Sequence, residues 1–494
     1  MLRSNSYNFE RISTLYGSMA LFLTVVHNVF LLYYVEMFVT VYKIDKTSFW
    51  IGEIAFLVWN SLNDPLFGWL SDRSLLQKST SVHPLDIVLL RLKRLSWSGP
   101  LFAVAFALFW VKWLHPGVQF VICLCLYDGF LTTVELQHTA LLADLVVHAK
   151  DRTLLNKRSS LFSAIGSISV FLSYMFWNNS SRISFQVFCM CLAVFSIVGF
   201  TISTRSLIKF CEMQKKDKEE YYELSEVVST SSSKTRHSNL KIGLSEYIKQ
   251  LAVNHNFRWF ISMNLLQVFH CHFNSNFFPL FLDTLVGDAV SPGVGPFLLG
   301  ISFVLPHLNN LYFLKLCEKH GVYKVINWLF YTKLALTLCM LILGSKNITF
   351  LCVFIASNRV FTEGTCKLLN LVVTDLVDED VVKHDREQAA SALLFGMSSL
   401  MSKPGQTFAP LLGTWLLAFY TGEDMFGSNS IGSIQSQQTE REMVSKHDAC
   451  FAILTAVPIV CATLQIFAWS RFTLHGAKLN YIKSARLGKS SDQI

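Results

Sequence analysis

The stretch WNSLNDPLFGWLSDR, residues 59–73, places polar side chains inside a long apolar run. Two asparagines and Asp64 interrupt the run just before a proline, and Asp72 and Arg73 end it. Polar groups in such a segment are costly in a lipid environment unless they serve a contact or a function. The rest of the chain decides which environment applies.

The composition indicates a membrane protein. Of 494 residues, 52% are hydrophobic and only 15% are charged, which is too apolar for a soluble protein of this length. A bilayer core of about 30 Å needs about 20 apolar residues per helix, and the apolar runs do not alternate as barrel strands do. We therefore predict an all-α membrane protein with twelve transmembrane helices in two six-helix bundles. The predicted segments begin near Tyr16, Phe49, Trp97, Gln119, Leu161, Phe185, Phe257, Gly295, Val322, Ile348, Ala389 and Ala449.

A charged, serine-rich stretch divides these segments into two sets of six. It predicts a bundle at 1–208, a flexible cytoplasmic linker at 209–256 and a second bundle at 257–494. Two six-helix bundles are typical of transporters that bind a substrate near the bilayer midplane, between the halves.

The orientation follows from the basic residues. Most of the 42 Lys and Arg residues fall in loops that are cytoplasmic if the first terminus is cytoplasmic. The glycosylation sequons at Asn178, Asn179 and Asn347 fall in predicted outer loops. We therefore predict a multi-pass glycoprotein of the plasma membrane (cell membrane) with both termini cytoplasmic. The net charge of +8 then faces anionic lipid, and no nucleic acid partner is expected.

The opening stretch also carries a recognisable pattern. Asp64-Pro-x-x-Gly68-x-x-x-Asp72-Arg73 resembles the inner-loop signature of the major facilitator superfamily. The glycine would let two helices approach closely, and the acid and arginine could pair at a gate. WNSLNDP is similar to the WDAxNDP pattern of the melibiose-permease branch, the sugar:cation symporters. The loops at 141–167 and 372–413 resemble that branch too.

The resemblance implies candidate transport residues. The family holds a coupling sodium with two acids in its second helix, and these positions are Asn60 and Asp64 here. Its sugar-binding acids fall at Thr24 and Glu135, and its helix-eleven lysine falls at Lys403. Since half of the sodium pair is missing, proton coupling through Glu135 or Asp64 is preferred over sodium coupling.

Charged residues within apolar segments mark two further candidates. Glu135 and Lys403 either face a polar path or form a buried pair that joins the halves. Arg359, Glu363 and Lys367 are spaced i, i+4, i+8, so they share one helix face. They form a structural clasp, a gate or an anion site, and an unpaired cation there would favour an acidic substrate.

The segment FHCHFNSNFFP contains three potential metal ligands at 270–272. Helix positions i and i+2 lie about 200° apart, so the two histidines cannot hold one ion, and no metal site is expected. His270 and Asn274 are instead expected to line a polar path. The sequence contains no nucleotide-binding loop or catalytic triad, so we expect neither an enzyme nor a cofactor.

These observations predict a monomeric secondary-active transporter in the lipid bilayer. It would move a small polar organic solute, with carbohydrate transport as one candidate, by alternating access and proton symport. Two alternatives stay open: a lysolipid-type carrier of the same fold, and a transport-inactive membrane protein that acts through partners.

Overall fold

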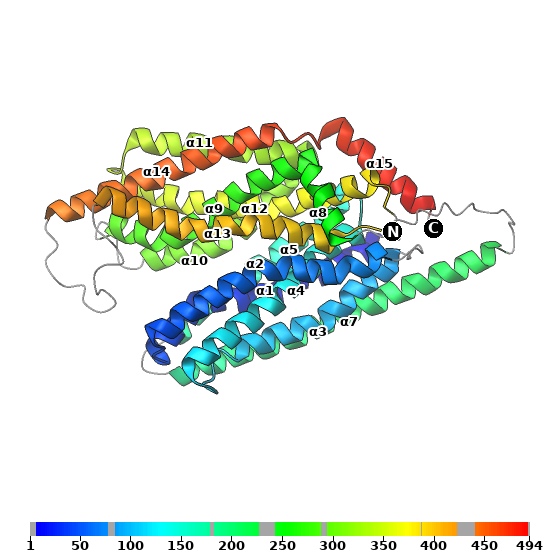
Figure 1. Ribbon diagram of the computed structural model, residues 1–494, viewed down its shortest axis with the longest axis horizontal. Coiled ribbons are helices and arrows are strands. Elements are labelled where there is room, and N and C mark those ends of the chain that lie inside the picture. Colours follow the sequence, from blue (N-terminus) through cyan, green and yellow to red (C-terminus); the bar gives the residue numbers. More distant parts are fainter. Residues whose placement is uncertain are drawn as a thin grey trace. The chain divides into compact units, whose positions relative to one another are not determined.

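The computed structural model describes residues 6–77, 84–177, 182–226, 243–287, 294–386, 388–421 and 440–492. These residues form helices joined by short turns, with no strand among them (Figure 1). The chain divides into two compact units. Unit 1 comprises Met1–Leu251, Asn370–Leu400 and Leu474–Ile494, and unit 2 comprises Ala252–Leu369 and Met401–Thr473.

Unit 1 is built on the first seven helices. They are α1 (Ser6–Glu36), α2 (Lys46–Gln77), α3 (Pro84–Ala107), α4 (Pro116–Leu145), α5 (Ala149–Gly166), α6 (Ser169–Phe176) and α7 (Arg182–Glu226). Helix α1 packs on α5 and α7, α3 packs on α4 and α7, and α2 packs on α4. Two shorter helices, α8 (Leu244–Val253) up to Leu251 and α15 (Gly476–Asp492), also belong to this unit (Figure 1).

Unit 2 contains the second set of long helices. They are α9 (His255–Phe281), α10 (Val294–His320), α11 (Val322–Leu343), α12 (Ile348–Lys383), α13 (Ser391–Thr421) and α14 (Glu440–Ser470). Helix α14 packs on α9 and α11, and α10 packs on α11. The last turns of α12 and the first turns of α13 belong to unit 1, so the unit boundary cuts both helices.

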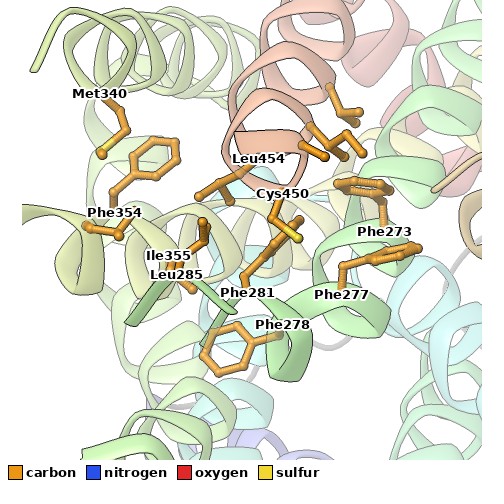
Figure 2. Packing of buried hydrophobic residues seen from close by; sticks show 14 of the residues in the cluster. Phe273, Phe277, Phe278, Phe281, Leu285, Met340, Phe354, Ile355, Cys450 and Leu454 are labelled. Atoms are coloured by element: carbon orange, nitrogen blue, oxygen red, sulfur yellow. The ribbon is translucent and has the colours of Figure 1, made fainter. Parts of the chain in front are cut away.

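An aromatic cluster forms the apolar core of unit 2. Phe273, Phe277 and Phe281 repeat at four-residue spacing on α9, so their rings share one face of that helix. They pack with Phe354 of α12 and with residues of α14 (Figure 2). In Figure 2 the ring of Phe278 lies at the edge of the labelled cluster.

The twelve predicted segments all fall on helices, so the predicted all-α fold is confirmed. A turn at residues 167–168 divides the fifth segment into α5 and α6. Five helices among the described residues are long and apolar enough to cross a bilayer on length and composition alone. The other long helices include α12, which carries charged residues along its length.

Parts of the predicted linker are helical, because α7 continues to Glu226 and α8 occupies Leu244–Val253. The predicted domain boundaries at 208 and 256 stay a prediction. The predicted glycosylation sites at Asn178 and Asn179 lie outside the described residues.

Candidate functional site

The gate motif of α2 lies directly against the first turns of α13. A Cβ atom added at Gly68 would lie 2.8 Å from the carbonyl oxygen of Ala392. A Cβ atom added at Gly396 would lie 2.5 Å from the carbonyl oxygen of Asp64. Because glycine has no side chain, the backbones of α2 and α13 can come into contact at both positions.

Asp72 connects the same two helices through its carboxylate. One oxygen accepts a hydrogen bond of 2.8 Å from the backbone N–H of Leu393, in the first turn of α13. Ala390, just before that helix, offers no side-chain acceptor, so a residue of α2 caps α13 instead. The exposed Arg73 does not pair with Asp72, and that part of the expectation is wrong. Successive helix residues point about 100° apart, so the two side chains cannot face the same partner.

Arg91 of α3 is the cation that Asp72 meets. It is 1% exposed and forms ion pairs with Asp72, at 3.1 Å, and with Asp144 at the end of α4. The hydroxyl of Ser391 donates a hydrogen bond of 2.6 Å to Asp144. One arginine thus joins α2, α3, α4 and the start of α13.

A second buried arginine, Arg152 of α5, binds the end of α12. It donates hydrogen bonds of 2.7 and 3.1 Å to the two carboxylate oxygens of Asp378. Its remaining donors reach the backbone carbonyls of Val146 and Ala143, at 2.8 and 3.2 Å. These carbonyls end α4, where a cation is favoured. We call Asp72, Arg91, Asp144, Arg152 and Asp378 the charged latch.

Helix α15 adds basic side chains to the acidic end of α12. Lys483 forms an ion pair of 2.8 Å with Asp375, and Arg486 lies 3.8 Å from Asp378. Burial raises the pKa of Asp375, although Lys483 and Arg152 oppose this change. Burial also acts to raise the pKa of Asp380, but the hydrogen bonds from His384 and Arg386 outweigh it and lower that pKa.

The interior of unit 1 holds polar groups away from the latch. Asp128 of α4 accepts a hydrogen bond from the amide of Asn63, next to the buried Asp64. Thr24 is hydrogen-bonded to Ser163 of α5, at 3.2 Å, where the related symporters have an acid. Glu135 is exposed on α4. Asp128 was not among the residues predicted from the sequence, although a lone acid within an apolar helix is a signal of this kind.

Unit 2 contains a connected set of buried amides, which we call the amide network: Gln267, Asn274, Asn358 and Gln465. Gln465 donates to Gln267 at 2.7 Å, and Gln267 donates to the carbonyl oxygen of Thr362 at the same distance. Asn274 donates to the hydroxyl of Thr362 and accepts from Asn358. Gln267 and Asn274 are seven residues apart, so they share one face of α9.

Lys333 of α11 ends the amide network with a positive charge. The residue is 2% exposed, and its ammonium group donates a hydrogen bond of 3.0 Å to the side-chain oxygen of Gln465 and lies 3.4 Å from His270. It also lies 5.3 Å from the ring centre of Phe330. Among the described residues, no carboxylate forms an ion pair with Lys333.

Arg359 is the second buried cation of unit 2. Its guanidinium carbon lies 4.5 Å from the ring centre of Phe303 and 5.6 Å from that of Phe278. Within the part of the chain that the structure describes, Arg359 makes no ion pair with Glu363, one turn further along α12. Its Nε atom is buried without a hydrogen-bond acceptor. The first two of the three charged residues predicted to share a face of α12 therefore do not form an ion pair.

The structure also describes the other predicted path residues and the third predicted glycosylation site. Asn60, Glu363, Lys367 and Lys403 are partly buried, and Asn347 is exposed at the start of α12. The Asn347 side-chain oxygen accepts a hydrogen bond of 3.1 Å from the N–H of Phe350. Glu135 belongs to unit 1 and Lys403 to unit 2, and their pairing stays a prediction.

Proteins of known sequence resemble this chain over almost all of its length. A family described as MFS/sugar transport protein matches residues 15–476. Transmembrane protein 180 of Gallus gallus is 57% identical over 485 residues, which cover 96% of this chain and 95% of that protein. Transmembrane protein 180 of Mus musculus is 54% identical over 491 residues, with the same two coverages.

Solved structures share the fold at low sequence identity. An outward-facing bacterial homologue of the iron transporter ferroportin gives a TM-score of 0.62 at 12% identity, covering 94% of this chain and 100% of that one. The E. coli fucose:proton symporter gives a TM-score of 0.55 at 12% identity, covering 94% and 99%. The family match, the two long relatives and the shared fold agree: the chain belongs to the MFS/sugar transport protein family of the major facilitator superfamily.

Proposed function

We propose that this chain is a proton-coupled symporter that moves a small polar organic solute, with sugar-like solutes among the candidates, by alternating access. The amide network of unit 2 carries the proposal. Four amides and Thr362 lie buried among apolar helices and bind one another. Buried polar groups lower stability relative to a well-packed apolar core, and amides that exchange hydrogen bonds suit a solute rich in hydroxyl groups.

The acids of unit 1 support proton coupling. Asp64 and Asp128 are buried in α2 and α4, and Asn63 connects the two helices through its bond to Asp128. A carboxylate can take up and release a proton, whereas Asn60 stands at the first of the two positions where a sodium site of this family has an acid. Glu135, which the resemblance also indicated, is the third candidate.

The charged latch is proposed to close the cytoplasmic side of the transporter. Asn347 precedes α12 and the latch acid Asp378 lies in the last turns of the same helix. The ends of a helix that spans the bilayer lie on opposite faces. A glycan on Asn347 would therefore place the latch, and the chain termini, in the cytoplasm.

Uptake by the purified full-length protein in liposomes tests the proposal. A panel of radiolabelled sugars, polyols and hydroxy acids is offered with an inward proton gradient. Accumulation that rises with the gradient supports proton symport. We expect at least one of three variants to lose gradient-driven uptake while exchange of solute for solute persists: Asp64→Asn, Asp128→Asn or Glu135→Gln.

The exposed Glu318 of α10 provides the matched control, since Glu318→Gln removes the same charge from the surface of the chain. Gradient-driven uptake that persists in all three acid variants would contradict proton coupling. Transport of lysolipid alone would favour the lipid carrier. No transport of any solute, with a folded protein, would favour the transport-inactive alternative.

A further inference from the structure

Arg359 has too few partners for a buried arginine. It is 7% exposed, and a guanidinium stays charged under all physiological conditions. Placing an arginine at the centre of a membrane helix costs about 2.5 to 3.5 kcal/mol even on the most lenient scale. A buried cation is therefore expected to have either a carboxylate partner or a functional reason.

The two phenylalanine contacts do not replace a carboxylate. A cation over an aromatic ring gains about 0.5 to 2 kcal/mol, and Phe303 is the closer of the two rings. A ring attracts the charge but accepts no conventional hydrogen bond from the N–H groups at the edge of the guanidinium. The buried Nε has no acceptor among the described residues, so at least one donor of this edge is unsatisfied.

The position of Arg359 excludes a lipid headgroup of the surrounding bilayer as its usual partner. It is eleven residues after Ile348, the first residue of α12, which corresponds to about 16 Å along the helix. That is close to the middle of a hydrocarbon core of about 30 Å. A partner for this cation has to enter the protein.

The neighbouring residue connects Arg359 to the amide network. Asn358 donates a hydrogen bond of 3.2 Å to Asn274, which in turn donates 3.1 Å to Thr362. A ligand bound at Arg359 would thus contact the guanidinium and lie near the neutral hydrogen-bonding groups of the amide network. Lys333 is different, because its ammonium group already has an acceptor in Gln465.

We infer that Arg359 binds an anionic group of the transported solute, a carboxylate or a phosphate that also carries hydroxyl groups. Two parallel N–H donors at the edge of a guanidinium match two oxygens of either group. Phe303 and Phe278 hold the guanidinium and keep that edge available. The inference rests on the proposed transport function and specifies the class of its substrate.

Matched pairs of compounds test the charge of the ligand. The purified full-length protein is heated with glucose or glucuronate, with glycerol or glycerol 3-phosphate, and with monoacylglycerol or lysophosphatidate. At least one anion is expected to raise the thermal unfolding midpoint while its neutral partner does not. The first two pairs report a free solute, and the third reports a lipid headgroup.

Substitutions then locate the binding. Arg359→Gln is expected to weaken binding of that anion about tenfold or more, and Arg359→Lys less, because an ammonium cannot bind two oxygens in the same geometry. Arg258→Gln, which removes an exposed arginine of the same unit, is expected to leave binding unchanged. Equal binding to Arg359→Gln and Arg258→Gln would overturn the inference, as would a panel in which no anion shifts the midpoint.

A ligand-free measurement guards against misfolding of the variants. If Arg359 is kept for binding, Arg359→Met unfolds at the same temperature as the wild type or higher. An Arg359→Met protein that unfolds at a clearly lower temperature would show a structural role and overturn the inference. If Arg359→Gln takes up neutral solutes as well as the wild type does, the proposed transport function stands, but the inference of an anionic substrate is wrong.

Discussion

The buried cations of units 1 and 2 differ in the kind of partner that they have. In unit 1, Arg91 and Arg152 each bind carboxylates from other helices. In unit 2, Lys333 and Arg359 meet amides and aromatic rings, and neither forms an ion pair within the described residues. The arginines of unit 1 therefore hold helices together through carboxylates, whereas the cations of unit 2 have no carboxylate of the described residues to hold.

The largest expected effect is the loss of a latch arginine. Arg91→Ala leaves Asp72 and Asp144 buried without their common cation, so we expect a loss of about 3 to 5 kcal/mol in the free energy of unfolding. Chemical unfolding of the full-length protein in mixed micelles measures this loss. Arg73→Ala is the matched control, and its effect is expected to stay within about 0.5 kcal/mol. If the two substitutions lower the free energy of unfolding equally, the ion pairs of Arg91 do not stabilise unit 1 and its contrast with unit 2 is wrong.

A smaller loss is expected at the glycine contact. Gly68→Leu forces α2 away from the backbone of Ala392, and overpacking of this kind costs about 1 to 3 kcal/mol. It should also slow uptake, because the latch can no longer close. Gly488→Leu in α15, where no atom lies within 4 Å of an added Cβ, is expected to be neutral or slightly stabilising. Unchanged uptake by Gly68→Leu would contradict a gating role for the motif.

The removal of an unpaired cation is expected to have the opposite sign. Lys333→Met deletes a buried charge that has no carboxylate partner, so unfolding free energy should stay within about 1 kcal/mol or rise, while uptake falls. Lys315→Met changes an exposed lysine of α10 and serves as the control. A loss as large as that of Arg91→Ala would mean that Lys333 is structural, and the contrast between the units would disappear.

The smallest effect on stability is expected at the sequon of Asn347. Thr349→Ala should remove one glycan from protein made in animal cells and change the unfolding free energy by less than about 0.5 kcal/mol, because Thr349 is exposed and Asn347 keeps its hydrogen bond to the N–H of Phe350. Gel mobility with and without glycosidase detects the glycan. An epitope tag at residue 347 gives a second readout, with a tag in a known extracellular loop of another protein as the control. If the sequon is never glycosylated and the tag is detected only in permeabilised cells, residue 347 is cytoplasmic and the latch faces outward.

The fold was predictable because its signals are local. Apolar length sets each membrane helix, and all twelve predicted segments correspond to helices. The motif of α2 also indicated a close helix contact through Gly68, since a small residue at a fixed spacing has few other uses.

The partners of the charged residues were not predictable from the sequence. Asp72 and Arg91 lie nineteen residues apart on different helices, and only folding brings them together. The same holds for Asn63 with Asp128 and for Lys333 with Gln465. A neighbour in sequence, such as Arg73, gives no guidance, because it points to another side of the helix.

The cap that Asp72 provides to α13 makes the amide of Leu393 a natural reporter. This N–H has no acceptor within its own helix, so its protection against exchange with deuterium depends on a carboxylate from α2. Whenever α2 moves away, that proton becomes exchangeable while those deeper in α13 stay protected. Hydrogen exchange at one backbone position therefore measures how often the latch opens, without any label or substrate.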